Sequence, residues 1–185
     1  MFTNFIKTYG DLSKTGQIPH ADLAGIEDVL PTELVELLHK GEGSYMKGFL
    51  WIVNPQEFKQ IVDDIYVPLS NPAICFARDA FGSLFLWEDN SVIYVDINNS
   101  KQEVVGRKIN VFFDLKLTDS GFLSKKTAYD KFVVAEQLLG PPEQDECYGY
   151  FPLLGMGGAG RIDNLKKVKP KEYLAIVAQT LGKIE

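Results

Sequence analysis

The stretch between residues 74 and 107 constrains the fold of this chain more than any other. Three segments in it, at 74–77, 83–87 and 91–97, are rich in aromatic and β-branched side chains, which favour strands. Glu88-Asp89-Asn90 joins the last two at hairpin length, and a second turn leads to a fourth strand at 103–107. The stretch therefore predicts an antiparallel β-meander.

Helical periodicity flanks this meander on both sides. Apolar residues that recur at i, i+3, i+4 and i+7 predict helices at 1–9, 31–40, 55–66, 110–117, 124–139 and 170–181. Two further apolar runs, at 49–53 and 147–154, predict strands, whereas 10–30 reads as an irregular arm and 162–168 is ambiguous. Because the helices and strands do not alternate as βαβ units, the order indicates an α+β fold. We expect a meander of about four to six strands with helices packed on it, in a single compact unit.

The charge of the chain is unevenly distributed. The net charge is -6, but residues 1–100 hold 6 basic and 14 acidic residues, a net of -8, while residues 101–185 hold 13 basic and 11 acidic, a net of +2. The net negative charge argues against nucleic acid as a direct ligand, because phosphate binding needs a clustered positive field. An acidic half can instead steer a basic partner by long-range attraction, or simply keep the surface solvated.

The first residues do not form a signal peptide, since Met1–Lys7 lacks a basic segment followed by a long apolar run. The longest apolar stretches, such as 49–53, are far shorter than the roughly 20 residues that span a bilayer. The two cysteines are too few for a disulfide scaffold. These features predict a cytoplasmic protein with reduced thiols and no membrane partner.

No motif predicts a catalytic, cofactor or metal site. Residues 155–160 match G-x-G-x-x-G, but no βαβ unit surrounds them and no acidic residue follows at the distance where a ribose ligand stands. Residues 44–47 match S-x-x-K without the motifs that accompany it in acyl enzymes. Cys147 with His20 or His39 has no supporting local motif either. We expect no metal and no cofactor, and the glycine-rich loop is expected to be a mobile turn or a partner contact.

Several ordered segments resemble known families. Residues 30–34, 41–45, 48–55 and 76–87 resemble the GAD-like domain, which predicts a GAD-like region over 1–104. Residues 140–142, 145–158, 164–168 and 174–179 are similar to the C-terminal domain of the Tdi-type immunity proteins, over 105–185. Those proteins are antidotes to DNase effectors delivered by type VI secretion. The resemblance implies a non-enzymatic protein that binds and neutralises a cognate basic toxin, a nuclease, by stoichiometric blockade.

Under this hypothesis the acidic half is the expected contact face. We expect the turn Glu88-Asp89 to be exposed and to contact the toxin, together with Asp63-Asp64 on a helix. Arg161 and the adjoining glycine loop are second candidates, because loops on rigid scaffolds often carry recognition. Two alternatives stay open: a small-molecule enzyme that uses the 155–160 loop, and an interaction module without a toxin, such as a homo-oligomer.

Overall fold

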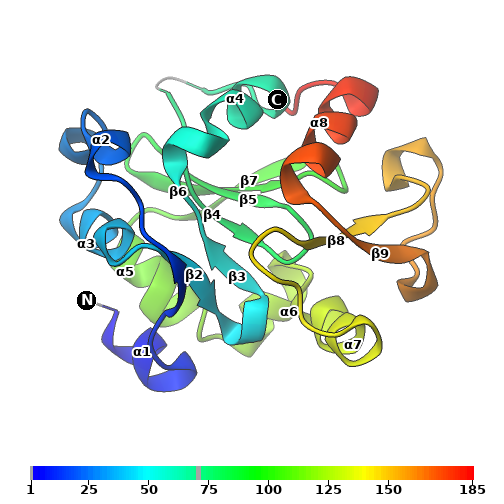
Figure 1. Ribbon diagram of the computed structural model, residues 1–185, viewed down its shortest axis with the longest axis horizontal. Helices are drawn as coiled ribbons and strands as arrows, with labels where there is room; N and C mark the ends of the chain where they lie inside the picture. Colours follow the sequence, from blue (N-terminus) through cyan, green and yellow to red (C-terminus); the bar gives the residue numbers. More distant parts are fainter. Residues whose placement is uncertain (1, 70–71) are drawn as a thin grey trace.

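The structure is a computed structural model that describes residues 2–69 and 72–185; Met1, which the sequence placed in the first helix, lies outside these residues. Within the described chain, a seven-stranded antiparallel sheet forms the centre, and its spatial order β1-β2-β3-β4-β5-β6-β7 is the order in the sequence (Figure 1). The strands are β1 (Ser13–Gly16), β2 (Glu42–Tyr45), β3 (Leu50–Ile52), β4 (Ile74–Asp79), β5 (Leu84–Glu88), β6 (Ser91–Asp96) and β7 (Lys101–Gly106). The α+β class and the meander are confirmed, but the predicted count of four to six strands is too low.

The missed strands β1 and β2 have little apolar content. Strand β1 is an exposed edge strand of polar residues, and β2 carries Gly43. A side chain at Gly43 would meet the Ser13 carbonyl oxygen at 2.4 Å, so only glycine lets the two backbones pair this closely. The hydrophobic pattern therefore could not reveal this end of the sheet.

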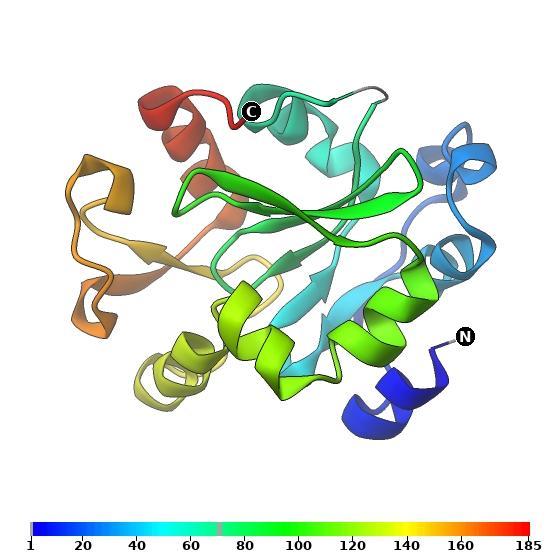
Figure 2. The same ribbon diagram turned by 180° about the vertical axis from the view of Figure 1, so that it is seen from behind.

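Helices cover both faces of the sheet, so its central strands are buried on both sides. One face packs against α1 (Thr3–Tyr9), α3 (Thr32–Lys40), α5 (Ile109–Val111), the π-helical turn η3 (Phe112–Lys116), α6 (Ser120–Lys126) and α7 (Tyr129–Leu139). Figure 2 shows the green segment α5–η3–α6 lying beneath the sheet. The other face packs against α4 (Pro55–Ile65) and α8 (Pro170–Leu181), which lie side by side at the top of Figure 1.

Local sequence signals explain where α4 begins and how it packs. The Asn54 side chain accepts a hydrogen bond from the Gln56 N–H at 3.1 Å, and Pro55 occupies the first helical turn. Phe58, Val62 and Ile65 recur on one face and are buried. The predicted helices at 55–66 and 170–181 are confirmed.

The predicted helix at 124–139 is wrong in its start and continuity. Two helices occupy this part of the chain, α6 and α7, separated at Thr127 and Ala128. The Asp119 carboxylate caps α6 by accepting from the Phe122 N–H at 2.7 Å, and Gly121 lies inside the helix. The capping residue thus outweighs the helix-breaking tendency of the glycine.

The chain ends in a small two-stranded sheet of β8 (Cys147–Tyr150) and β9 (Leu165–Val168), followed by α8. The Tyr148 N–H donates to the Ala80 carbonyl at 2.7 Å, which attaches β8 to the β4–β5 turn. Each of the two hydrophobic clusters includes side chains from before and after residue 104.

The remaining short helices are α2 (His20–Leu23), η1 (Glu27–Val29), η2 (Met46–Gly48), η4 (Leu154–Met156) and η5 (Ile162–Asn164).

Among the described residues, no helix has the length and apolar character that crossing a bilayer requires.

Candidate functional site

A groove of about 610 Å³ lies between α4, the β5–β6 turn and the segment that follows α2. Its walls are partly apolar, with Trp87 and Ile74 from the sheet and Pro55 from the start of α4. The charged residues of its described lining are four carboxylates and a single lysine: Asp28, Asp63, Glu88, Asp89 and Lys59. We call this feature the acidic groove. Its carboxylates come from three separate parts of the chain, and together they give it a negative potential.

Trp87 fixes one wall of the acidic groove. Its indole N–H donates to the Val29 carbonyl oxygen at 3.2 Å, which ties η1 to strand β5. The Trp87 side chain is buried, whereas Val29 is 59% exposed. A partner would therefore meet an apolar side chain next to the carboxylates, and could bury it on binding.

Glu88 is not exposed, so that part of the prediction is wrong. It is 2% exposed, and its carboxylate accepts hydrogen bonds from the Tyr66 hydroxyl at 2.8 Å and the Leu69 N–H at 2.6 Å. Burial, reinforced by the bond to Glu88, raises the pKa of Tyr66. Glu88 therefore joins β5 to the chain that leaves α4, because a buried carboxylate needs such donors.

Asp89 is exposed as expected. Glu88 pairs with Ser91 across the β5–β6 hairpin, so Asp89 and Asn90 form a two-residue loop. Both have positive φ, 46° and 57°, which a type I′ turn requires and which Asp and Asn tolerate better than most residues. The turn directs Asp89 away from the sheet and into the rim of the groove.

Asp63 and Asp64 are both exposed on α4, but the structure separates their surroundings. Asp63 lines the acidic groove, whereas Asp64 does not and accepts from the Gln60 side chain at 2.9 Å. Neighbours on a helix point about 100° apart, which accounts for the difference. The groove thus brings together Asp63, Glu88 and Asp89 of the predicted residues.

Arg161 is exposed and pairs with Asp163 at 2.6 Å, and it does not line the acidic groove. The ion pair raises the pKa of Arg161 and lowers that of Asp163. The adjoining 155–160 loop leads into η5 and then β9, so no helix begins within the glycine motif.

Sequence reasoning missed Asp28, Val29 and Trp87 as groove residues. The first two lie in a segment without periodicity, and Trp87 reads as a core residue. The only signal in the sequence was the apolar Val29 directly after Glu27 and Asp28, in a short segment between Gly25 and Pro31.

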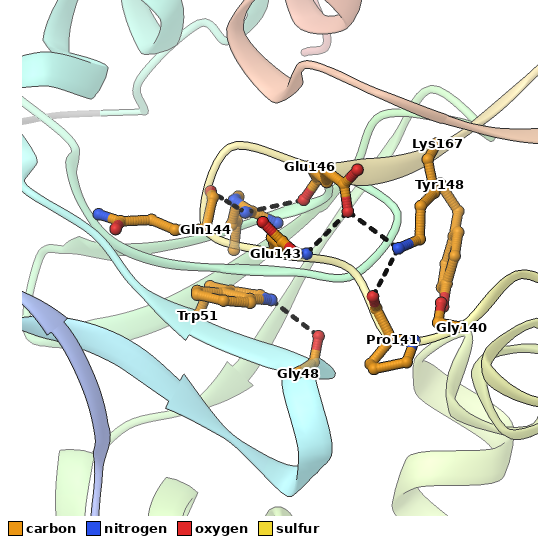
Figure 3. A network of polar contacts seen from close by, with 10 residues as sticks. Gly48, Trp51, Gly140, Pro141, Glu143, Gln144, Glu146, Tyr148 and Lys167 are labelled. Atoms are coloured by element: carbon orange, nitrogen blue, oxygen red, sulfur yellow. Dashed lines mark hydrogen bonds and ion pairs between the residues drawn. The ribbon is translucent and has the colours of Figure 1, made fainter.

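A second polar feature lies where β4 meets the loop before β8. The Arg78 guanidinium donates to the carbonyls of Gln144 at 2.8 Å, Glu146 at 3.0 Å and Asp79 at 3.3 Å. The central carbon of the guanidinium lies 5.1 Å from the centre of the Trp51 ring. The Trp51 indole N–H donates to the Gly48 carbonyl oxygen at 2.8 Å. Figure 3 shows Trp51 on the side of the sheet and Gln144 and Glu146 on the loop that precedes β8.

The same loop is held from its far side by Glu146 and Lys167. Their ion pair measures 2.9 Å, and Lys167 also donates to the Pro141 carbonyl at 2.7 Å (Figure 3). Bonds from the Glu143 N–H and from Lys167 hold the pKa of Glu146 below its usual value. The loop therefore has a fixed path between the sheet and β9.

Asp79 is a buried carboxylate at the β4–β5 turn. It accepts hydrogen bonds from the N–H groups of Phe81 at 2.8 Å and Ser83 at 3.0 Å, and from the Tyr94 hydroxyl at 2.8 Å. Burial raises its pKa to about 7, although the three donors act in the opposite direction. Its donors belong to the protein itself, which marks it as a structural group of the turn.

The other reactive side chains are not arranged for chemistry. Burial raises the pKa of the Cys147 thiol to about 12 and also raises that of Cys75, so neither is a ready nucleophile. His39 lies 3.0 Å from Glu27 and packs on His20, and within the described residues no contact joins either ring to Cys147. In the same part of the chain, no three metal-ligating side chains gather into a group.

Comparison with known proteins supplies two family matches. Residues 1–101 match the GAD-like domain, and residues 107–180 match the family described as T6SS immunity protein Tdi1, C-terminal. Among curated proteins, none matches the chain. The fold is similar to the crystal structure of Atu4351 from Agrobacterium tumefaciens, with a TM-score of 0.78 and 19% identity over 97% of this chain and 89% of that one.

Proposed function

Since this chain belongs to the GAD-like domain family and continues into a region that matches the type VI secretion immunity protein Tdi1, we propose that it is an immunity protein that neutralises a cognate effector. The observation that carries the proposal is this tandem match, in the expected order and over most of the chain. We propose further that the effector is a DNase and that inhibition is a stoichiometric blockade inside the cytoplasm, without a catalytic step.

The acidic groove supports the proposed mode of inhibition. A nuclease must hold a polyanion and therefore carries a basic surface. A groove that presents three exposed carboxylates, Asp28, Asp63 and Asp89, and one lysine is complementary to such a surface. Opposite charge accelerates the encounter, and the exposed apolar side chain of Val29 adds burial once the partners meet.

The contact residues that we propose are Asp28, Asp63 and Asp89 on the acidic groove, with Asp64 beside it. Glu88 acts indirectly, because it is buried and holds the hairpin that presents Asp89. Arg161 belongs to a separate surface and stays a second candidate. The alternative of a small-molecule enzyme that uses the 155–160 loop has less support, because the motif overlaps only the single turn η4 and no α-helix opens within it.

The first test is co-expression with the effector encoded beside the gene. We expect growth rescue, co-purification and an inhibition curve of DNA cleavage that ends at one equivalent of this protein. An active effector that is neither bound nor inhibited would overturn the proposed function. Inhibition at far less than one equivalent would contradict a stoichiometric blockade.

The interface is tested by reversing three groove charges together, Asp28→Lys, Asp63→Lys and Asp89→Lys. The association rate should fall by about 10- to 100-fold at low salt, and its dependence on ionic strength should flatten. Asp11→Lys, Glu36→Lys and Glu143→Lys make a matched control, because these exposed carboxylates lie outside the groove and the net charge changes equally. An equal loss in both triple variants would show that net charge, rather than the groove, steers binding.

A further inference from the structure

Arg78 is a buried cation with an incomplete set of partners. It is 1% exposed, and its three hydrogen bonds all go to carbonyl oxygens, which use three of the five N–H groups of a guanidinium. Within the described residues it forms no ion pair. An arginine stays protonated in a protein, so a full positive charge is buried here with attraction from Asp79 and Glu42 but without a direct ion pair, which is costly.

This charge lies in the wall of a cavity of about 290 Å³, separate from the acidic groove. Trp51 packs on the guanidinium, and Val53 and Phe58 add apolar wall. The cavity lies between strands of the GAD-like region and the beginning of α8. Its size suits a small molecule of about ten heavy atoms rather than a nucleotide.

The opposite wall is the N-terminus of α8, which also favours an anion. No side chain caps this twelve-residue helix, and Pro170 at its first position has no N–H. The N–H groups of Lys171 and Glu172 therefore have no partner within the helix, and the positive end of the helix dipole faces the cavity. Lys169 adds an exposed cation at the rim.

The acidic residues of the cavity narrow the class of ligand. Glu57 pairs with Lys171, and Glu42 accepts from the Asn54 N–H and the Gln144 side chain, each at 3.1 Å. Both carboxylates already have donors, and Glu42 attracts Arg78 through space without a hydrogen bond between them. Asp145 and Glu172 are exposed at the rim and would repel a dianion such as sulfate.

We propose that this cavity binds a small monocarboxylate with an apolar body. The carboxylate lies between Arg78 and the first turn of α8, and the apolar body packs against Trp51 and Phe58. Such a ligand would form the direct ion pair that the buried guanidinium lacks among the described residues, and would bridge the two family regions. The proposal is independent of effector binding.

Phenylacetate is a suitable probe, with phenylacetamide as its neutral isostere and sulfate as a dianion, all at constant ionic strength. We expect phenylacetate to bind the full-length protein with a Kd of about 0.1–1 mM by calorimetry and to raise the melting temperature. Phenylacetamide should bind at least tenfold more weakly, and sulfate should have no saturable effect. No heat and no thermal shift with phenylacetate, or equal effects of all three compounds, would overturn the proposal.

The chain contains two tryptophans, which locate the binding. Trp51 lines this cavity and Trp87 lines the acidic groove. In ¹⁵N-labelled protein the indole N–H resonance of Trp51 should shift on titration with phenylacetate while that of Trp87 stays in place; Trp87→Phe assigns the two signals. A shift of Trp87 alone would place the ligand elsewhere and refute the site.

Two variants test the charges. Lys169→Gln should weaken phenylacetate binding about two- to fivefold, whereas Lys166→Gln, an exposed lysine on β9 outside the cavity, should leave it unchanged. Arg78→Met should abolish binding if circular dichroism shows a native fold. If Arg78→Met does not fold, the two lysine variants and the indole resonances test the site instead. Equal affinity of Lys169→Gln and Lys166→Gln for phenylacetate would contradict the proposed site.

Discussion

Glu88 and Asp89 are neighbours in the sequence and carry the same charge, yet the fold gives them different roles. Glu88 accepts hydrogen bonds from Tyr66 and Leu69 beneath the hairpin, and Asp89 stands in solvent at its tip. Strand alternation and a two-residue turn produce this difference. Two adjacent acidic residues in a sequence show neither burial nor the presence of hydrogen-bond donors. The sequence could therefore identify the pair as a candidate, but it could not predict that one residue is buried and the other exposed.

We predict that Glu88→Ala lowers the free energy of unfolding by about 2–3 kcal/mol, because it leaves buried donors without an acceptor. Asp89→Ala should change it by less than about 0.5 kcal/mol, as expected for an exposed turn residue. Urea denaturation of the two variants checks this directly. Equal destabilisation would contradict the division of roles.

Asp79 predicts a pH dependence of stability. Its pKa in the folded protein is raised to about 7 from the ordinary aspartate value of 3.8, so between about pH 4 and pH 7 the folded state holds a proton that the unfolded state has released. The free energy of unfolding contributed by this group therefore falls as pH rises through that window, by up to a few kcal/mol, and is constant above it.

Asp79→Asn should remove this contribution. The difference in unfolding free energy between the wild type and Asp79→Asn should favour the wild type progressively less from pH 4.5 to pH 7. Asp63→Asn, on an exposed carboxylate, is the control and should show a much smaller slope. A slope that is unchanged by Asp79→Asn would show that the three donors keep the carboxylate ionised throughout.

At the scale of elements, the sequence predicted those with strong apolar periodicity or clear end signals. Helix α4 has both, with Asn54-Pro55 at its start and a buried stripe, and α8 begins at Pro170 and ends before Gly182. Strands β1 and β2 have neither, because β1 is a polar edge and β2 depends on a close backbone approach at Gly43. Pairing with neighbours, rather than local propensity, creates these two strands.

Asn54 makes a prediction for α4 as an element. Its side-chain oxygen caps the helix, and its amide donates to Asp22 at 2.7 Å, which ties α2 to α4 beside the acidic groove. Asn54→Ala should cost about 2 kcal/mol, more than the roughly 1 kcal/mol of a cap alone. A double-mutant cycle with Asp22→Ala should give a coupling energy of about 0.5–1 kcal/mol. Additive changes in the free energy of unfolding would show that the bond between Asn54 and Asp22 contributes nothing to stability.

For the molecule as a whole, both hydrophobic clusters draw side chains from either side of residue 104. We propose that 1–104 and 105–185 are regions of sequence similarity and do not fold separately. Expressed alone, 1–104 should be insoluble or lack a cooperative thermal transition, while the full chain should unfold in a single transition. A well-folded 1–104 fragment, seen by dispersed amide resonances, would contradict this.

The candidate site illustrates what depends on the whole molecule. Asp63 and Asp89 could be predicted as exposed acidic residues on a helix and a turn, but the groove that joins them also needs η1, which has no pattern of its own. The Arg78 cavity is further from prediction, since its two walls are separated by about half the chain. Long-range packing brings such walls together, and local sequence patterns do not predict that packing.

The order of the seven-stranded sheet has a consequence for biosynthesis. Since each strand pairs with the one before it, a nascent chain can add strands as they leave the ribosome. Helix α8, which covers one face together with α4, is synthesised after all seven strands, and Ile184 then pairs with Tyr66 at the end of α4. At about 5–20 residues per second, translation takes roughly 10–40 s. A nascent chain whose α8 has not yet left the ribosome would lack that part of the cover, so the apolar face beneath α8 would stay exposed until the helix emerges.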